Sequence, residues 1–198
     1  MTAEMQKRLD GLSAFLCSHP SVRSAALYGS LAEGREDMYS DIDLALDVSG
    51  TDNGQFLLTL PAYLQEKYPV LYTDFAPSLA PEKYILTAAV YPEEPFLLLD
   101  ISVIAEPHFR TVTKEMLSSR NDLYSHTLKV FSANLKHYLR GMDCAADIRK
   151  MFGRLPGLPE TDSPAGMLLE THRWLSQNGT PVLRTYAERF TPFLPSAL

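Results

Sequence analysis

The sequence has 198 residues, 45% of them hydrophobic and 21% charged, which is typical of a folded chain with a buried core and not of a disordered one. Its formal net charge of −6 lacks the basic excess of proteins that bind long nucleic acid through phosphates. Two cysteines, Cys17 and Cys144, exclude a disulfide framework, and the five histidines lack the spacing of a zinc site. With no signal-peptide pattern and no apolar run long enough to span a membrane, we expect a cytoplasmic protein.

The first half of the chain predicts helices alternating with strands. Apolar residues at helical spacing predict a helix over residues 3–18, which Pro20 ends. The segment SAALY, residues 24–28, predicts a strand that Gly29 breaks. The run DIDLALDV, residues 41–48, predicts a second strand, and residues 56–68 are more typical of a helix.

Three further strands and a helical region follow. We expect strands over 69–76, 83–91 and 95–105, the last two close enough to form a hairpin. From Thr111 onward the pattern is helical, interrupted by a Pro- and Gly-rich loop over 153–166. The sequence therefore predicts an α+β fold, with a mixed sheet flanked by helices in a catalytic domain over 1–108 and an α-helical C-terminal region over 109–198.

Two carboxylates stand on alternate positions of the second predicted strand. Side chains at i and i+2 of a strand point to the same face, so Asp41 and Asp43 project together while Ile42 and Leu44 face the core. Carboxylates so close repel each other unless a cation lies between them. Because Mg²⁺ prefers oxygen ligands and often shares them with substrate phosphates, this pair predicts half of a phosphoryl- or nucleotidyl-transfer site.

Gly29 and Ser30 supply the other half of this site. A glycine at the end of a strand permits a tight turn and a close approach of the backbone, and the following helix start offers free N–H groups to phosphate oxygens. The Ser30 hydroxyl adds a donor. Phosphates held there would lie close enough to share metal ions with Asp41 and Asp43.

The motif Gly29-Ser30, ten residues, then Asp41-Ile42-Asp43 resembles the signature of the nucleotidyltransferase superfamily that includes DNA polymerase beta. The wider string YGSLAEGREDMYSDIDL is similar to antibiotic nucleotidyltransferases of the kanamycin, lincosamide and streptomycin types. The resemblance implies an enzyme that transfers a nucleoside monophosphate from an NTP to a hydroxyl group, using two Mg²⁺ ions held by three carboxylates.

The third carboxylate of the family comes from a later strand, and two residues compete for it. Asp100 interrupts an apolar run that predicts a central strand, where an unpaired charge is costly to bury. Asp74 lies in a shorter run closer to a turn, so we favour Asp100. By resemblance, Asp41, Asp43 and Asp100 are the catalytic and metal-binding residues, and Asp100 also takes the proton of the acceptor hydroxyl.

The expected reaction moves AMP from ATP to a small-molecule acceptor, an antibiotic being one candidate. An acidic protein suits a cationic acceptor such as an aminoglycoside. Two alternatives are an antitoxin-like enzyme that modifies a partner protein and a degenerate nucleotide-binding module. We expect no long nucleic acid and no membrane as partners, and a homodimer stays open because some relatives build the site across two copies.

Other polar residues have both a functional and a structural interpretation. Two sets of basic residues are candidates to attract the triphosphate: Arg35, and one face of the helix predicted after Thr111, with Lys129, Lys136 and Arg140. Solvated surface charges are, however, the more common interpretation of such residues. Asp47 is interpreted as solvated, and Trp174 is as compatible with the core as with stacking on a base. Three acidic residues are candidates to line an acceptor pocket: Glu160, Asp162 and Glu170.

Overall fold

The computed structural model describes residues 2–195 and divides into two compact units. The first unit contains the chain up to residue 90 together with residues 97–121, and the second contains residues 91–96 together with the chain from 122 onward. The chain therefore passes from one unit to the other three times.

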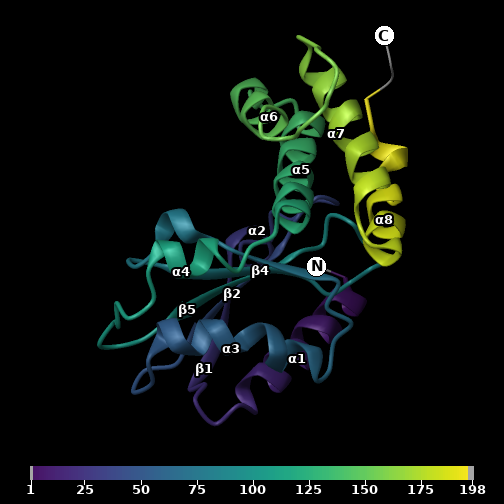
Figure 1. The fold of residues 1–198 in the computed structure, drawn as a ribbon. Coiled ribbons are helices and arrows are strands. Elements are labelled where there is room, and N and C mark those ends of the chain that lie inside the picture. The colour runs from purple at the N-terminus through teal and green to yellow at the C-terminus, as the bar shows by residue number, and fades with distance from the viewer. Residues whose placement is uncertain (1, 196–198) are drawn as a thin grey trace. The chain divides into compact units, whose positions relative to one another are not determined.

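The first unit is built on a five-stranded sheet (Figure 1). Its elements, in chain order, are α1 (Ala3–Cys17), β1 (Ser24–Tyr28), α2 (Gly29–Ala32), β2 (Ile42–Asp47), α3 (Asn53–Gln65), β3 (Tyr72–Phe75), the 3-10 helix η1 (Pro77–Leu79), β4 (Tyr84–Ala89), β5 (Leu99–Ile104) and α4 (Lys114–Ser118).

The sheet is mixed, and its strand order is β1-β2-β5-β4-β3. Strands β2 and β5 run parallel, and the other neighbouring pairs are antiparallel. Along β2, Ile42, Leu44 and Leu46 are buried while the alternate residues are partly exposed, as expected for a sheet with one covered face. Helices α1 and α3 lie on the same side of the sheet and supply buried leucines to this core (Figure 1). The opposite face carries the polar members of the strands.

The second unit is helical. It consists of α5 (Leu123–Leu139), α6 (Ala145–Phe152), α7 (Pro164–Asn178), α8 (Pro181–Glu188) and the 3-10 helix η2 (Thr191–Phe193). Its core includes Phe131 and Phe190, whose rings meet edge to face at 5.4 Å. Phe96 packs against Phe190 at 5.2 Å, and Tyr186 donates a hydrogen bond to the carbonyl of Pro95, so residues 91–96 belong to this core.

The prediction of an α+β fold with a mixed sheet and a helical C-terminal region is confirmed. Strand β1 has the predicted bounds, whereas α3 begins at Asn53 because Asp52 caps its N-terminus. Strands β4 and β5 do pair antiparallel, but the predicted tight hairpin is wrong, because residues 90–98 separate them and part of this connection packs in the helical unit. Of the helices in the described part of the chain, none is long and apolar enough to cross a membrane.

Candidate functional site

Five side chains form a row across one face of the sheet. The strand register pairs Tyr28 with Asp43, Asp43 with Asp100, Asp100 with Thr87, and Thr87 with Asp74. Residues opposite each other in a sheet project to the same face, with Cβ atoms roughly 5 Å apart. The row therefore brings together residues from all five strands.

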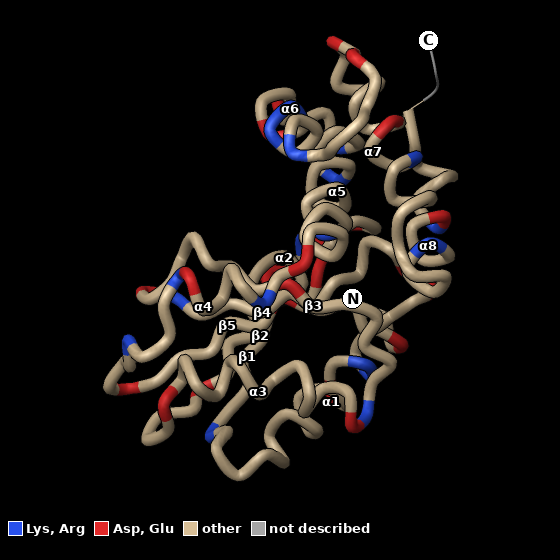
Figure 2. Tube along the Cα trace, viewed as in Figure 1, with Lys and Arg blue, Asp and Glu red and all other residues tan. Residues whose placement is uncertain are grey.

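Asp43 and Asp100 are direct neighbours in this row because β2 and β5 are parallel and in register. Both side chains are half-buried. The Thr87 hydroxyl donates a hydrogen bond to Asp100 Oδ1, which fixes one oxygen of that carboxylate. Acidic positions gather close to α2 at this end of the sheet (Figure 2). The two carboxylates that the sequence places 57 residues apart are thus side by side.

Asp41 lies one residue before β2. Its Oδ1 accepts a hydrogen bond from the backbone N–H of Leu98 at 3.3 Å, and the N–H of Ile42 donates to the carbonyl of Leu98 at 2.9 Å. The Asp41 side chain is therefore held at the N-terminal end of the parallel strands β2 and β5. Strand alternation gives it the same face as Asp43, as the sequence predicts.

Gly29 brings the backbone against Asp43. It is the first residue of α2 and has φ +72, a left-handed conformation that favours glycine. A Cβ atom at this position would lie 2.3 Å from Asp43 Oδ2, which is closer than any stable contact. Only glycine therefore allows this turn to approach the carboxylate. The hydroxyl of the following Ser30 has no hydrogen-bond partner within residues 2–195, so it is available to a ligand.

Asp74 is fully buried in β3, at the end of the strand order. Strands β4 and β5 separate it from Asp43, with Thr87 and Asp100 in the intervening positions of the row. The register therefore places Asp100, and not Asp74, next to Asp43. The catalytic roles of these residues stay predictions.

A divalent cation fits these residues in the chemistry of their donor atoms. Carboxylate oxygens are the ligands that Mg²⁺ prefers, and the strand register places Asp41, Asp43 and Asp100 on one face at one end of the sheet. Within residues 2–195, however, no three His, Cys, Asp or Glu side chains are grouped closely enough to hold a metal ion. The backbone thus presents the donors together, without a closed set of three ligands.

Tyr28, Thr87 and Ser102 lie beside the candidate carboxylates and were not predicted from the sequence. The Tyr28 hydroxyl and the Ser102 hydroxyl are hydrogen-bonded at 3.0 Å. Burial raises the pKa of Tyr28, and repulsion from the nearby Asp43 and Asp100 carboxylates acts in the same direction, against the hydrogen bond from Ser102. One signal was present in the sequence: Thr87 and Ser102 are polar residues within largely apolar strands.

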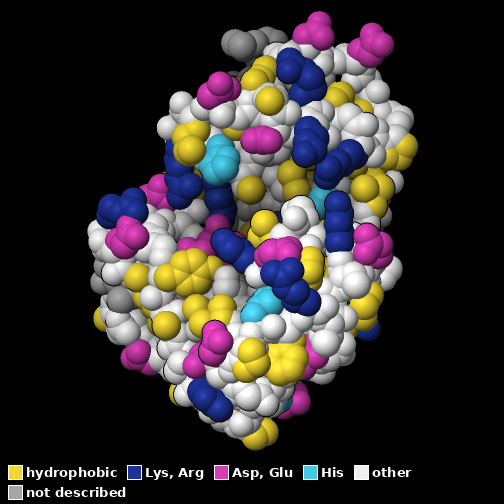
Figure 3. All heavy atoms as spheres, turned by 90° about the vertical axis from the view of Figure 1, so that its left-hand side faces the viewer, with side chains coloured by type: hydrophobic (Ala, Val, Ile, Leu, Met, Phe, Trp, Pro, Cys, Tyr) yellow, Lys and Arg dark blue, Asp and Glu magenta, His cyan; other side chains and the backbone are white. Residues whose placement is uncertain are grey.

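The basic residues considered as candidates to attract the triphosphate differ in burial and in their partners. Arg35 forms an ion pair with Glu33. Lys136 on α5 is buried, with 3% of its surface exposed, so the interpretation of this helix face as simply solvated is wrong for Lys136. On the face in Figure 3, Lys and Arg side chains are numerous over the helical unit, in the upper part of the view. The net charge of −6 therefore coexists with local positive surface.

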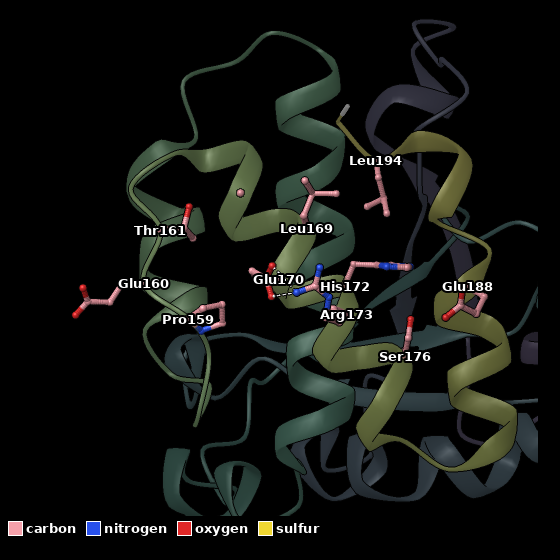
Figure 4. Close-up of a pocket in the computed structure, with 11 residues that line it drawn as sticks. Pro159, Glu160, Thr161, Leu169, Glu170, His172, Arg173, Ser176, Glu188 and Leu194 are labelled. Carbon is pink, nitrogen blue, oxygen red and sulfur yellow. Dashed lines mark hydrogen bonds and ion pairs between the residues drawn. The ribbon is translucent and has the colours of Figure 1, made fainter. Parts of the chain in front are cut away.

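The helical unit contains a cavity of about 610 Å³ beside α7 and α8 (Figure 4). Glu160 and Glu170 line it, as the sequence analysis considered, whereas Asp162 is not among its lining residues. Glu170 forms an ion pair with Arg173 at 2.7 Å, which offsets its charge. Trp174 is half-buried and stacks on Tyr124, with ring centroids 5.8 Å apart.

One family model matches part of the chain. The model of the family described as polymerase beta, nucleotidyltransferase matches residues 11–78, which include Gly29, Ser30, Asp41 and Asp43. No curated protein matches the chain.

Several solved structures are similar to the chain at low identity and with TM-scores below 0.5. They include the GLD-2/RNP-8 complex, with 17% identity and a TM-score of 0.40 over 92% of this chain and 58% of that chain. Another is the polymerase core of TRAMP, an RNA surveillance complex, with 12% identity and a TM-score of 0.42 over 90% of this chain and 61% of that chain. A third is a cytoplasmic RNA terminal U-transferase, with 13% identity and a TM-score of 0.36 over 90% of this chain and 66% of that chain. The chain thus spans less than two thirds of each of these structures, and similarities this low carry no inference about substrate.

Proposed function

We propose that the chain transfers a nucleoside monophosphate, AMP from ATP, to a hydroxyl group of a small-molecule acceptor; the match of residues 11–78 to the polymerase beta, nucleotidyltransferase family model supports this. The observation that carries the proposal is the adjacent pair Asp43 and Asp100, with the backbone of Gly29 against Asp43. A phosphate-binding turn and two carboxylates on neighbouring strands are the parts that phosphoryl-group chemistry requires.

Asp41, Asp43 and Asp100 would hold two Mg²⁺ ions. When bound, these ions neutralise charge on the triphosphate and make the acceptor hydroxyl more acidic. Because Gly29 has no side chain, the turn that would hold the triphosphate lies directly against Asp43, and the unpartnered Ser30 hydroxyl would donate a hydrogen bond to a phosphate oxygen.

Asp100 has a second part in the proposed reaction. Because Thr87 occupies Asp100 Oδ1, the other oxygen is the one that accepts the proton of the acceptor hydroxyl. The acceptor oxygen then forms a bond to the α-phosphorus, and the bond from phosphorus to the pyrophosphate oxygen breaks. The products are the nucleotidylated acceptor and pyrophosphate.

The remaining parts of the proposal concern the setting of the enzyme. We propose a cytoplasmic enzyme with its catalytic domain over residues 1–108 and a helical region over 109–198. Its acceptor is a small molecule, with antibiotics as the first class to test, and neither long nucleic acid nor a membrane is a partner. A second copy in a homodimer is a further source of an acceptor-side base.

The test uses the purified full chain with Mg²⁺, radiolabelled ATP and a panel of aminoglycosides and lincosamides. Labelled adduct and released pyrophosphate are measured for the wild type, Asp43→Asn and Asp47→Asn. Asp47 is the matched control, because it lies on the same face of β2 but accepts its hydrogen bond from the Ser49 N–H at the opposite end of the strand.

We expect transfer by the wild type and by Asp47→Asn, and a loss of at least about a hundredfold in Asp43→Asn, which is the scale of losing one charge-stabilising group. Mg²⁺-dependent ATP binding without transfer to the panel would contradict the proposed acceptor class and favour a protein acceptor. Absence of ATP binding would contradict the proposed enzyme and favour a degenerate protein that keeps the fold and has lost the ATP site.

A further inference from the structure

A second cavity, of about 390 Å³, lies in the sheet unit itself. Its lining includes Tyr28, Lys83, Ser102, Ile104 and His108. Ser102 and Ile104 follow Asp100 at alternate positions of β5, so all three project to the same face of the sheet. The cavity and the carboxylate row therefore share one face of one unit, and its volume is within the usual range of small-ligand sites, roughly 300–1,000 Å³.

Large apolar side chains are exposed at this cavity. Tyr28 is 39% exposed and Ile104 is 50% exposed, although both belong to strands. Ile85, which is paired with Ser102, adds a further apolar side chain to the lining. An aromatic ring and two aliphatic side chains on one open face form a surface suited to a flat, apolar ring.

The polar groups of the cavity are fixed in position. The amide nitrogen of Asn53 donates to His108 Nδ1 at 3.1 Å, because the Asn53 oxygen accepts the N–H of Phe109. His108 Nε2 consequently carries the proton and donates to the carbonyl of Pro81 at 2.6 Å. With both ring nitrogens engaged, His108 is a wall of the cavity and not a base. The hydrogen-bonded hydroxyls of Tyr28 and Ser102 are the groups left to orient a ligand.

Among the side chains that line the cavity, the charge without an ion-pair partner is positive, although the Asp43 and Asp100 carboxylates lie near Tyr28 on the same face. Glu82 forms an ion pair with Arg110 at 3.0 Å, so these two charges offset each other. The ammonium group of Lys83 has no ion-pair or hydrogen-bond partner among residues 2–195. An ammonium group beside an apolar wall is suited to the anionic group of a ligand whose ring packs on that wall.

We propose that this cavity binds the acceptor substrate, and that the acceptor is a small molecule with a flat apolar ring and an anionic group such as a phosphate or carboxylate. The inference rests on the proposed function: it keeps the small-molecule acceptor but replaces the cationic antibiotic, which the net charge alone suggested, by an anionic molecule, because Lys83 lines the cavity. The ring lies against Tyr28 and Ile104, and the anionic group contacts Lys83. Ser102 is two residues from Asp100 along β5, about 7 Å, so a hydroxyl on such a ligand reaches the predicted proton acceptor.

Binding of phenyl phosphate to the full chain tests the proposal, with benzylamine as a probe of similar ring size and opposite charge. Calorimetry is performed with Mg²⁺ and a non-hydrolysable ATP analogue at saturation, so that the donor site is occupied. The variants are Lys83→Gln, which removes the positive charge, and Ile104→Asp, which places a negative charge on the exposed apolar wall. Lys7→Gln, on the exposed surface of α1, is the matched control.

We expect phenyl phosphate to bind more tightly than benzylamine. Binding of phenyl phosphate is expected to weaken about tenfold or more in Lys83→Gln and Ile104→Asp, the scale of losing one charged contact, and to stay unchanged in Lys7→Gln. Equal binding by the wild type and both cavity variants, tighter binding of benzylamine, or no binding of phenyl phosphate would overturn the proposal.

Binding of the Mg²⁺–ATP analogue is measured separately for each variant. If the analogue binds the wild type and not Asp43→Asn while phenyl phosphate fails to bind, the acceptor assignment is wrong and the proposed donor site stands. If the analogue does not bind the wild type, the proposed function is wrong. Binding of phenyl phosphate, measured without the analogue, then still shows whether the cavity binds a ligand of this chemistry.

Discussion

Thr87 on β4 donates a hydrogen bond to the carboxylate of Asp100 on β5, directly opposite in the strand register. Thr87 is 5% exposed, so this bond is shielded from water and leaves Asp100 with one committed oxygen and one open oxygen. Thr87 is therefore a positioning residue for the predicted third carboxylate.

Replacing Thr87 by valine keeps the shape of the side chain and removes the hydroxyl. We expect kcat for nucleotidyl transfer to fall roughly tenfold and the Mg²⁺ concentration for half-maximal activity to rise, because Asp100 is no longer held in one orientation. Initial rates over a Mg²⁺ titration measure both effects. Thr87→Ser should restore them, and a Thr87→Val enzyme with the wild-type Mg²⁺ dependence would contradict the positioning role.

Asp100→Asn and Asp74→Asn separate the two candidates for the third carboxylate. Asp100 lies beside Asp43, whereas Asp74 is two strands further along the sheet. We expect transfer per folded molecule to fall at least about a hundredfold in Asp100→Asn and to change little in Asp74→Asn. Circular dichroism corrects for the folded fraction, since Asp74 is fully buried and its replacement affects stability. The reverse pattern would assign the role to Asp74.

Gly29→Ala tests the close approach of the turn to Asp43. The new Cβ atom would meet Asp43 Oδ2 at 2.3 Å, so the carboxylate or the turn must shift, and we expect most of the activity to be lost. Gly34→Ala is the control, because Gly34 also has a positive φ, +65, but nothing lies within 4 Å of its Cβ position. Both variants should lose about 1 kcal/mol of stability through backbone strain, so equal activities would exclude a special role for the contact at Gly29.

His172 predicts a pH dependence of stability. It is 7% exposed on α7, and burial lowers its pKa in the folded state, against the opposing effects of the Ala187 carbonyl and Glu188. The unfolded chain therefore binds a proton at a higher pH than the folded one, so the stabilising contribution is complete above about pH 6.5 and is lost as the pH falls below it.

Urea unfolding from pH 8 to pH 5.5 measures this contribution. The free energy of unfolding should decrease by up to about 1.4 kcal/mol for each pH unit over which only the unfolded chain is protonated at His172. In His172→Gln the slope over this interval should be smaller. A wild-type curve that is flat from pH 8 to pH 5.5 would show that His172 does not titrate differently on folding.

The sequence predicted the local parts of the site and not its non-local parts. Strand β1 and the alternation of Asp41 and Asp43 follow from periodicity, which depends only on neighbouring residues. The parallel pairing that places Asp100 beside Asp43 depends on long-range contacts, so the sequence could suggest Asp100 only from its burial cost. The hydrogen bond between Tyr28 and Ser102 joins residues 74 positions apart, and no local pattern predicts it.

In the helical unit, prediction from the sequence was limited by the length of the helices. Helices α6 and α8 were not predicted individually, because each has only eight residues, and about two turns repeat an apolar pattern too few times to separate it from chance. The hairpin prediction failed for a related reason: the apolar Phe96 appeared to continue a strand, but its partners are Phe190 and Phe193, far along the chain.

The passage of residues 91–96 through the helical unit has a consequence for the order of events during synthesis. The chain must leave the sheet unit after β4, contribute this segment to the other unit, and return to form β5. Tyr186, which binds the Pro95 carbonyl, is made 91 positions later. On the ribosome, the strand that carries Asp100 is thus complete long before residues 91–96 have their packing partners, so this segment stays unpacked until the C-terminal helices are made.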